Sequence, residues 1–242
     1  MRLWQTTLIA TFLWWAPAAR AADPTAEAIL RRADAILAPR EFEATITFTS
    51  RKANGTAKTF AIHMWKKDAD KTRFRFLSPA DDRDMEVLRV GDDMWNYLPN
   101  LKRSLRISPK QEFHGGDFSN SDMLRVDLVE DYTPTVLPSA SPDEWLLELT
   151  AKNDQVAYHR VRYFIAKRDF MPRRQEFYAQ SGKLVRRLEM SAPKVFGRLV
   201  RPSRYVMKNM LVAGRETEMV WDTFAVKPLG DDGLFAQASL GR

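Results

Sequence analysis

The stretch FEATITFTSRKANGTAKTFAIHMW, residues 42–65, decides the fold. From Phe42 to Phe48 every second residue is apolar and the others are Glu or Thr, which is the period of a strand that buries one face. Asn54-Gly55 then supplies the dipeptide that a tight hairpin turn prefers, because both residues tolerate positive φ angles. Alternation resumes from Phe60 to Met64. These residues predict a β-hairpin with one apolar and one polar face.

Short alternating runs continue along most of the chain, separated by turn residues such as Pro79, Gly91-Asp92 and Pro99-Asn100. Further strands are expected at residues 73–77, 85–90, 94–98, 102–107, 145–149, 161–165, 175–178, 184–190, 205–211 and 219–226. Hairpin following hairpin favours an up-and-down order. We therefore predict a mainly β fold with some α-helix: a single open, incomplete antiparallel β-barrel of about eleven strands, with a two-layer sandwich as the alternative.

Two segments depart from this pattern. Residues 26–37 have apolar side chains at helical spacing, with Asp23 as the expected N-cap and Pro24 at the first helical position. Residues 111–131, called the insertion below, contain a Gly-Gly pair and scattered apolar residues, which indicates a loop leading into a short helix. We expect an N-terminal helix beside the sheet and a short helical lid over it.

Residues 1–22 have the form of a secretory signal peptide. Arg2 is positive, an apolar run extends from Leu3 to Ala16, and small residues flank Arg20 as a cleavage site. Only seventeen uncharged residues separate Arg2 from Arg20, fewer than the roughly 20 that span a bilayer. We expect residues 23–242 to form one domain that functions outside the cytoplasm.

The composition excludes several classes of protein. The 242 residues are 45% hydrophobic and include no cysteine, so a large core is expected without disulfides, thiolate metal sites or cysteine nucleophiles. Without Arg2 and Arg20, Lys plus Arg falls from 38 to 36 against 31 acidic residues, leaving a net charge of +5. The basic pairs are dispersed among acidic residues, which favours a solvated surface over nucleic-acid binding, with weak attraction to anionic lipid head groups as the alternative.

No catalytic or metal-binding pattern is present in the sequence. The histidines His63, His114 and His159 lie at no metal-ligand spacing. The run from His114 to Asp117 is similar to the glycine motif of an oxyanion hole, but the chain lacks the Gly-x-Ser-x-Gly turn that would carry a nucleophile. No glycine-rich nucleotide loop occurs either. We predict that the protein is not an enzyme and uses no metal or other cofactor.

The apolar residues of the strands form the candidate binding surface. If the sheet curves, its concave face collects more apolar bulk than one short helix covers, and the insertion would close only part of the gap. Burying an acyl chain of about sixteen carbons there offers on the order of 10 kcal/mol before ordering costs. The alternative is that these residues only form a core against the helix. The candidate ligand-binding residues are Phe48, Phe60, Ile62, Met64, Phe74, Phe76, Trp95, Tyr97, Phe113, Phe118, Met123 and Leu124, and Met190, Met207 and Met219 are expected on the same face.

An ordered set of short motifs resembles a known family. The set is Gly91-Asp-Asp-Met-Trp95-Asn-Tyr97-Leu-Pro99, then the run from Lys102 to Ile107, then Phe113-His-Gly-Gly116-Asp117-Phe118 and Asp122. It resembles the LolA-like outer-membrane lipoprotein-sorting proteins of Gram-negative bacteria, in the uncharacterised branch with a Trp-x-Tyr-x-Pro signature. One departure is that members often have Ser where this chain has Gly116.

The resemblance implies a fold like that of LolA and LolB, with a helical lid and a hydrophobic cavity for acyl groups. It implies a periplasmic carrier or chaperone of lipoproteins or lipids, together with an inner-membrane transporter and an outer-membrane acceptor. The signature and lid residues are Arg103, Arg106, Gly116, Asp117 and Asp122. Arg106 is expected to pair with Asp117 or Asp122 and hold the lid; the alternative is an exposed ion pair of little energetic value. The alternative function is an extracytoplasmic sensor or protein-interaction module that uses the same fold without lipid transfer.

Overall fold

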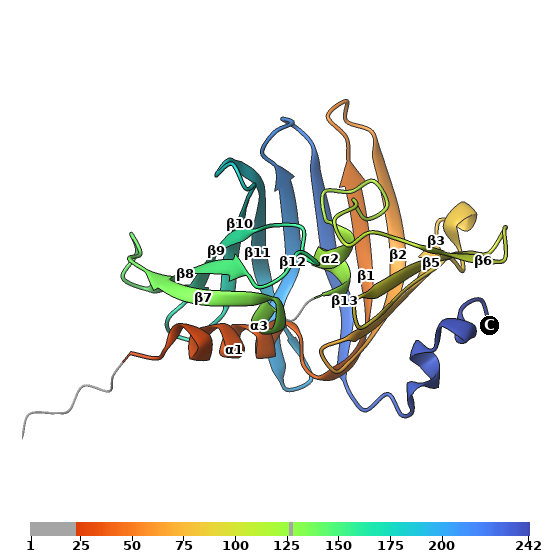
Figure 1. Cartoon of the computed structure of the whole chain (residues 1–242), viewed down its shortest axis with the longest axis horizontal. Helices are drawn as coiled ribbons and strands as arrows, with labels where there is room; N and C mark the ends of the chain where they lie inside the picture. Colours follow the sequence, from red (N-terminus) through yellow and green to blue (C-terminus); the bar gives the residue numbers. More distant parts are fainter. Residues whose placement is uncertain (1–22, 126–127) are drawn as a thin grey trace, which may run out of the picture.

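All the strands of the described part of the chain lie in one antiparallel sheet. The structure, a computed structural model, describes residues 23–125 and 128–242, so the predicted signal peptide lies outside the described residues. Thirteen strands follow the order β6-β5-β4-β3-β2-β1-β13-β12-β11-β10-β9-β8-β7. Figure 1 shows this sheet curving around the insertion, which carries α2 and α3. The predicted up-and-down order is confirmed, and the predicted count of about eleven strands was too low.

The elements have the following bounds. The strands of the first half are β1 (Glu41–Arg51), β2 (Ala57–Lys67), β3 (Lys71–Ser78), β4 (Glu86–Val90), β5 (Asp93–Leu98) and β6 (Arg103–Arg106). Those of the second half are β7 (Tyr132–Leu137), β8 (Glu144–Ala151), β9 (Arg160–Ala166), β10 (Pro172–Tyr178), β11 (Leu184–Phe196), β12 (Leu199–Asn209) and β13 (Glu216–Val226). The helices are α1 (Ala26–Leu37), α2 (Asn120–Leu124) and α3 (Leu128–Asp131), and the short 3-10 helices are η1 (Ala80–Asp82), η2 (Asp232–Phe235) and η3 (Gln237–Ser239).

The strands form a meander that curves into an incomplete barrel with one gap. Strands that follow one another in the sequence are paired, with the exception of β6 and β7. The last strand, β13, pairs with the first, β1, so β6 and β7 form the two edges of the sheet. The insertion is the connection between those two edges. The same segment that leaves the barrel open is therefore in a position to cover the opening.

The unpredicted strand is β7. It contains Pro134, which has no N–H to donate, and its side chains do not alternate between buried and exposed. As an edge strand it pairs only with β8, so proline is tolerated and no strict apolar period is required. The sequence pattern that identified the other strands is therefore absent from this one.

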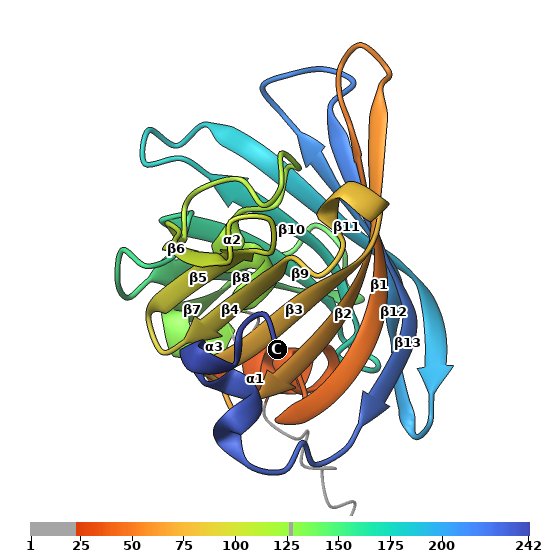
Figure 2. The ribbon, with the colours of Figure 1, turned by 90° about the vertical axis from the view of Figure 1, so that its right-hand side faces the viewer.

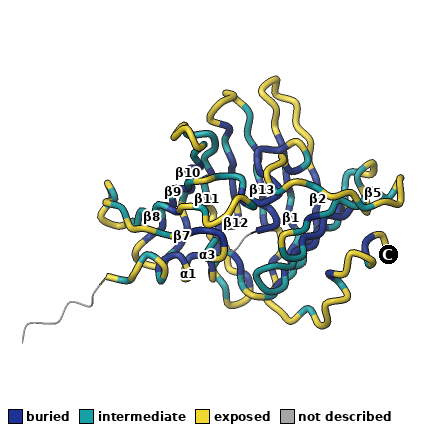
Figure 3. Tube along the Cα trace, viewed as in Figure 1, coloured by how far each residue is buried: buried dark blue, intermediate teal, exposed yellow. Residues whose placement is uncertain are grey.

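The main core lies on the concave face of the sheet. Phe48 lies opposite Phe60 in β2 and Met219 in β13, and Ile46 lies opposite Ile62. Their side chains are fully or nearly fully buried, whereas the intervening Thr residues on the other face are half-buried. Figure 3 shows this alternation along β1 and β2. The hairpin predicted from residues 42–65 is confirmed, with Gly55 at a φ of 83° in its turn.

Helix α1 packs against the second half of the sheet through Ile29, Leu30 and Ala33, which are fully buried. Its N-cap is Thr25, whose hydroxyl accepts from the Ala28 N–H at 3.2 Å. The prediction of Asp23 as N-cap and Pro24 as the first helical residue was wrong. Thr and Asp both serve as caps, and here the helix begins two residues later. In the described part of the chain no helix is long and apolar enough to span a membrane.

A second, smaller cluster lies on the outer face. Leu88 packs there with Phe235 and Leu240 from the C-terminal segment, and Trp95 and Tyr97 pack against this cluster. Figure 2 shows the C-terminal segment lying outside the sheet. The prediction that Trp95 and Tyr97 face the concave side was wrong. Their neighbour Met94 faces the main core instead, because the C-terminal segment covers the two aromatic rings from outside.

Candidate functional site

A cavity lies between the concave face and the insertion. Its walls come from α1, from strands of both halves of the sheet, and from the insertion. Its lining residues are Leu37, Ile46, Met64, Phe74, Phe118, Ser121, Asp122, Met123, Arg125, Leu128, Tyr132, Val156, Gln175, Phe177, Leu188, Met190, Arg201, Tyr205, Met207, Met219 and Trp221. The free volume is about 90 Å³.

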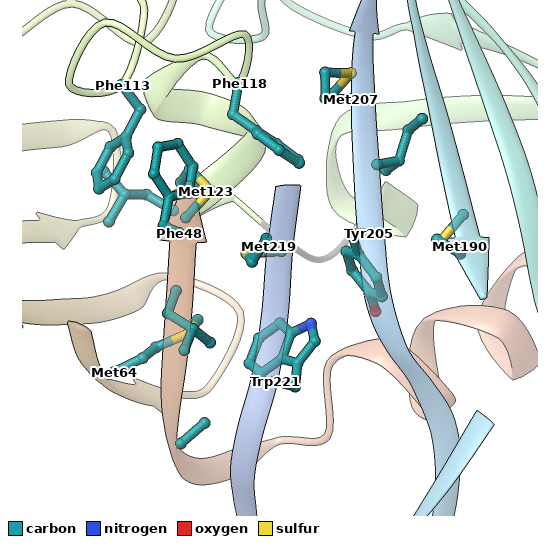
Figure 4. Close-up of a cluster of buried hydrophobic side chains, with 14 of the residues drawn as sticks. Phe48, Met64, Phe113, Phe118, Met123, Met190, Tyr205, Met207, Met219 and Trp221 are labelled. Atoms are coloured by element: carbon teal, nitrogen blue, oxygen red, sulfur yellow. The ribbon is translucent and has the colours of Figure 1, made fainter. Parts of the chain in front are cut away.

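Methionine is the most frequent lining residue, with five side chains: Met64, Met123, Met190, Met207 and Met219. Figure 4 shows them distributed over β2, the insertion, β11, β12 and β13, so that they line the cavity from several sides. Methionine has three rotatable bonds and a polarisable sulfur, and it adapts to ligands of different shape. The walls can therefore rearrange without breaking the strands that carry them.

The insertion is anchored in the core by an aromatic cluster. Phe113 is fully buried, and its ring lies 5.4 Å from the ring of Phe48, 5.6 Å from Phe74 and 6.0 Å from Phe76. Phe118 lies 5.9 Å from Phe48 and reaches the cavity. Phe113 therefore fixes the start of the insertion to the sheet, and Phe118 forms part of the cavity wall.

Gly116 allows the insertion to approach β1 closely. A Cβ atom at this position would lie 2.7 Å from Cζ of Phe48 and 3.2 Å from Oγ1 of Thr217. A residue with a side chain, such as the Ser that the family resemblance suggests at this position, would require the ring of Phe48 to shift.

Asp117 is the polar anchor of the same segment. Its side chain is fully buried and accepts from Asn209 Nδ2 at 2.9 Å and from Thr217 Oγ1 at 3.2 Å. Arg215 Nε lies 3.1 Å from the carboxylate, and the Asp117 carbonyl oxygen accepts from Arg186 Nε at 3.1 Å. These partners lie on or beside β11, β12 and β13, so Asp117 connects the insertion to three strands.

A second anchor holds the other end of the insertion. The guanidinium of Arg125 donates to Asp131 at 2.9 Å from Nε and to Asp92 at 2.8 Å from Nη1. The carbonyl oxygen of Leu124 accepts from Thr72 Oγ1 and from Arg89 Nη1. The insertion is thus attached to β12 and β13 at one end and to β3 and β4 at the other, with the cavity between the two anchors.

Asp122 joins the lid helix to the cavity. Its carboxylate accepts from the Ser119 N–H at 2.8 Å and from Tyr158 Oη at 3.2 Å, and the Ser119 hydroxyl accepts from the Asp122 N–H, which completes a capping box on α2. Burial raises the pKa of Asp122 to about 6, and the hydrogen bonds to Ser119 and Tyr158 oppose this shift. Asp122 therefore titrates at a higher pH in the folded protein than in the unfolded chain.

We expect Asp122→Asn to change the pH dependence of stability. The folded protein binds a proton at Asp122 between about pH 4 and pH 6 that the unfolded chain releases, so this residue's contribution to stability falls as pH rises through that window. A rise of this size corresponds to at most about 3 kcal/mol. The variant still accepts from Ser119 and should match the wild type near pH 4 and exceed it at pH 7. Urea unfolding across this pH range measures the difference in the free energy of unfolding between the variant and the wild type. A difference that does not change with pH would contradict the raised pKa of Asp122.

The cavity wall contains a buried arginine that is not among the predicted site residues. Arg201 is fully buried, its Nη2 donates to Tyr205 Oη at 2.9 Å, and its guanidinium carbon lies 4.0 Å from the Trp221 ring centre and 4.1 Å from that of Phe224. Nε and Nη1 have no hydrogen-bond partner among the described residues. Burial lowers the pKa of Arg201 from its usual value, and Tyr205 opposes this shift.

The predicted ligand-binding residues fall into three groups. Met64, Phe74, Phe118 and Met123 line the cavity, as do the expected Met190, Met207 and Met219. Phe48, Phe60, Ile62, Phe76, Phe113 and Leu124 are buried in the surrounding core. Trp95 and Tyr97 lie outside, against the outer cluster.

Of the predicted signature residues, Gly116, Asp117 and Asp122 lie in the insertion as described above. The prediction that Arg106 pairs with Asp117 or Asp122 was wrong, since Arg106 pairs with Asp93 on the adjacent strand. Both side chains of this pair are exposed, as the alternative expected. Arg103 and Arg106, the first and last residues of β6, are exposed at the edge of the sheet, so they do not reach the carboxylates of the insertion.

The structure also places two of the histidines. The imidazole of His114 lies against the rings of Phe60, Phe76 and Phe113, and burial lowers its pKa to about 4. His63 stacks on Trp65 at 4.1 Å on the outer face. Among the described residues, no three His, Asp or Glu side chains lie close enough to hold a metal ion.

Sequence reasoning missed Arg201, Gln175, Tyr205 and Trp221 as cavity residues. A signal for Arg201 existed: counting back by twos from Met207, which was expected on the concave face, reaches Tyr205, Ser203 and Arg201, all buried. Pro202 and the charge of arginine obscured it, because both suggest an exposed edge. Trp221 lies two residues after Met219 and follows from the same rule.

Comparisons with known proteins identify the relatives. A protein-family model described as "Uncharacterized protein" matches residues 68–242. A LolA superfamily protein of Nitrosomonas europaea is 25% identical, with a TM-score of 0.82 over 89% of this chain and 99% of the other. A DUF1329 family protein of Desulfovibrio piger is 21% identical, with a TM-score of 0.79 over 90% and 100% of the two chains.

A third relative is described as an outer membrane lipoprotein-sorting protein domain of Vibrio parahaemolyticus. It is 22% identical, with a TM-score of 0.73 over 88% of this chain and 100% of the other. The likenesses at 21% and 22% identity show the fold alone. No curated protein matches the sequence.

Proposed function

We propose that the chain, which belongs to the family whose model matches residues 68–242 and is similar to a LolA superfamily protein, is a periplasmic carrier of lipids or lipoproteins that binds their acyl chains in the cavity beneath the insertion. The observation that supports this proposal best is the methionine-rich cavity wall. An acyl chain is apolar, flexible and variable in length, and adaptable walls suit such a ligand. The proposed role requires no catalytic residue and no cofactor, only uptake and release.

Loading requires the cavity to expand. A cavity of about 150 Å³ holds one benzene molecule, so the present 90 Å³ is too small for a long acyl chain. Six of the lining residues belong to the insertion: Phe118, Ser121, Asp122, Met123, Arg125 and Leu128. Movement of the insertion would remove one complete wall, and rotation of the methionines would adjust the others.

The expansion limits the affinity, which suits a carrier. Each buried methylene contributes roughly 0.8 kcal/mol, so an acyl chain of about sixteen carbons offers on the order of 10 kcal/mol. Displacing the insertion breaks contacts of the closed state and consumes part of that energy. The cargo can then leave again when a membrane acceptor offers a comparable apolar environment. We propose an inner-membrane transporter as the source and an outer-membrane acceptor as the destination.

Phe118→Ala is expected to weaken acyl-chain binding by roughly tenfold. Its ring forms part of the cavity wall, and losing the contact of one buried aromatic side chain costs about 1 to 3 kcal/mol of binding. Trp95→Ala is the matched control, since it removes a larger ring from the outer cluster. Delipidated protein titrated with a fluorescent fatty acid measures both. Equal weakening by the two variants, or none by Phe118→Ala, would contradict this cavity as the binding site.

The carrier proposal as a whole is tested on protein purified from its native periplasm. Mass spectrometry of an organic extract should detect copurified acyl lipids or a lipoprotein. If the extract contains none and the delipidated protein takes up no fatty acid, the proposal fails.

A second candidate function is an extracytoplasmic sensor or protein-interaction module. The observation in its favour is the small volume of the cavity, because such a module needs a filled interior. It predicts a stable complex with a protein partner and no saturable uptake of fatty acid, so the same titration separates the two candidates.

A further inference from the structure

Arg201 is the feature of the cavity that a purely apolar ligand does not explain. Its guanidinium stacks against the faces of Trp221 and Phe224, which leaves the edge of the group available for hydrogen bonding. Among the described residues, only Nη2 makes a hydrogen bond along that edge, by donating to the hydroxyl of Tyr205. Within residues 23–125 and 128–242, no carboxylate pairs with Arg201, and Nε and Nη1 have no acceptor.

The other arginine of the cavity wall provides a comparison. Arg125 is also buried, but its guanidinium pairs with Asp131 and Asp92. An arginine that serves only to hold the fold is expected to be compensated in this way, because an unpaired buried charge loses its hydration without replacement. Arg201 retains its donors and has no counter-ion among the residues that the structure describes, which is the arrangement expected of a site that receives its counter-ion from a ligand.

The position of Arg201 also fits the head of an amphiphile. Along β12, Arg201, Tyr205 and Met207 lie on the concave side, and six residues of strand span about 20 Å. On β13, Met219 lies nearer to the insertion than Trp221 does. The guanidinium of Arg201 therefore lies at the end of the cavity wall that contains Trp221, and methionine side chains line the wall from there towards the insertion.

We propose that the cavity selects anionic amphiphiles, and that Arg201 binds the negatively charged head group, a carboxylate or a phosphate, while the methionine-lined walls hold the acyl tail. This inference rests on the proposed carrier function and names its ligand class. Arginine suits both anions, because its planar donors match two oxygens of a carboxylate or phosphate group. The surrounding aromatic faces exclude water and strengthen the interaction.

The test compares three ligands that share a twelve-carbon chain: dodecanoic acid, dodecyl phosphate and dodecanol. Each competes at pH 8 with N-phenyl-1-naphthylamine, a neutral fluorescent reporter, for full-length delipidated protein. Wild type should bind the two anions at least about tenfold more tightly than the alcohol, since hydrogen bonds to a charged group are worth about one factor of ten or more. Comparison of the acid with the phosphate shows which head group the site prefers.

Arg201→Met should remove this selectivity, so that the two anions and dodecanol bind to this variant within about twofold of one another, because the apolar walls remain but the donors of the guanidinium are gone. The variant is expected to fold, since replacing an uncompensated buried charge by an apolar residue is often neutral or stabilising. Arg201→Lys is the second variant; it keeps a positive charge and should retain a preference for anions. Because selectivity is a ratio within one protein, partial unfolding of a variant does not alter it.

Each outcome decides a different point. Wild type that binds acid and alcohol equally, or an Arg201→Met variant that keeps the wild-type preference, overturns the role of Arg201 but leaves the carrier function standing. Wild type that displaces no reporter with any of the three ligands contradicts the carrier function itself. A preference for anions that is lost in Arg201→Met and kept in Arg201→Lys supports the proposal.

Discussion

Asp117→Ala is expected to lower the free energy of unfolding by about 3 to 5 kcal/mol, the usual cost of removing one partner from a buried ionic network. The carboxylate is fully buried between Asn209, Thr217 and Arg215, and its loss leaves their polar groups without an acceptor. The same change should detach the insertion from β12 and β13, because this carboxylate connects them. Urea unfolding measures the stability, and hydrogen exchange measures the release of residues 113–125.

Asp154→Ala is the matched control for that experiment. Asp154 is exposed on a loop and accepts a hydrogen bond from the adjacent Gln155 side chain, so its removal should change stability by less than about 0.5 kcal/mol. Amide exchange should accelerate at residues 113–125 in Asp117→Ala and stay unchanged in β1. Uniformly faster exchange throughout the sheet would instead show that Asp117 stabilises the whole fold and has no local effect on the insertion.

Phe113→Ala is expected to be equally destabilising, by about 3 to 5 kcal/mol. The ring is fully buried among Phe48, Phe74 and Phe76, and its removal leaves a void that these rigid rings cannot fill. Because Phe113 lies outside the cavity lining but anchors the insertion, the variant should open more readily and take up fatty acid faster than wild type. Stopped-flow fluorescence after mixing with a fluorescent fatty acid measures this rate.

Phe170→Ala provides the control for Phe113→Ala. Phe170 is half-buried beside β9 and contacts Arg32 through its ring face at 4.5 Å, far from the insertion in sequence. It should cost less stability and leave the rate of uptake unchanged. If Phe113→Ala lowers stability without changing the rate, the insertion does not limit access to the cavity.

Most strands were predictable because their side chains alternate, and the exceptions have physical causes. The edge strand β7 buries little and contains Pro134, so it lacks the period that marks the others. The N-terminal helix was predicted, but its cap was not, because Asp23 and Thr25 both fit the preference. The insertion was predicted as a loop with a short helix, and the structure divides the helical part into α2 and α3.

The candidate site was less predictable than the fold. Phe118 and Met123 were identified because they are apolar residues in a segment expected to cover the sheet, and both line the cavity. Trp95 and Tyr97 were misplaced because their alternation with Met94 and Asn96 is equally consistent with either face. Arg201 was missed because a charged side chain in a strand ordinarily faces water.

The sequence by itself determined the period-two pattern, and with it the meander of strands, the break at the insertion and the apolar character of one face. Such a pattern states which residues of one strand share a side, but not which side becomes the interior. That choice depended on segments distant in sequence: the C-terminal turns that cover Trp95 from outside, and the rings of Trp221 and Phe224 that enclose Arg201. Only the tertiary structure therefore decided that an uncompensated positive charge lies in the cavity wall, because its burial is a property of the assembled sheet and not of any one strand.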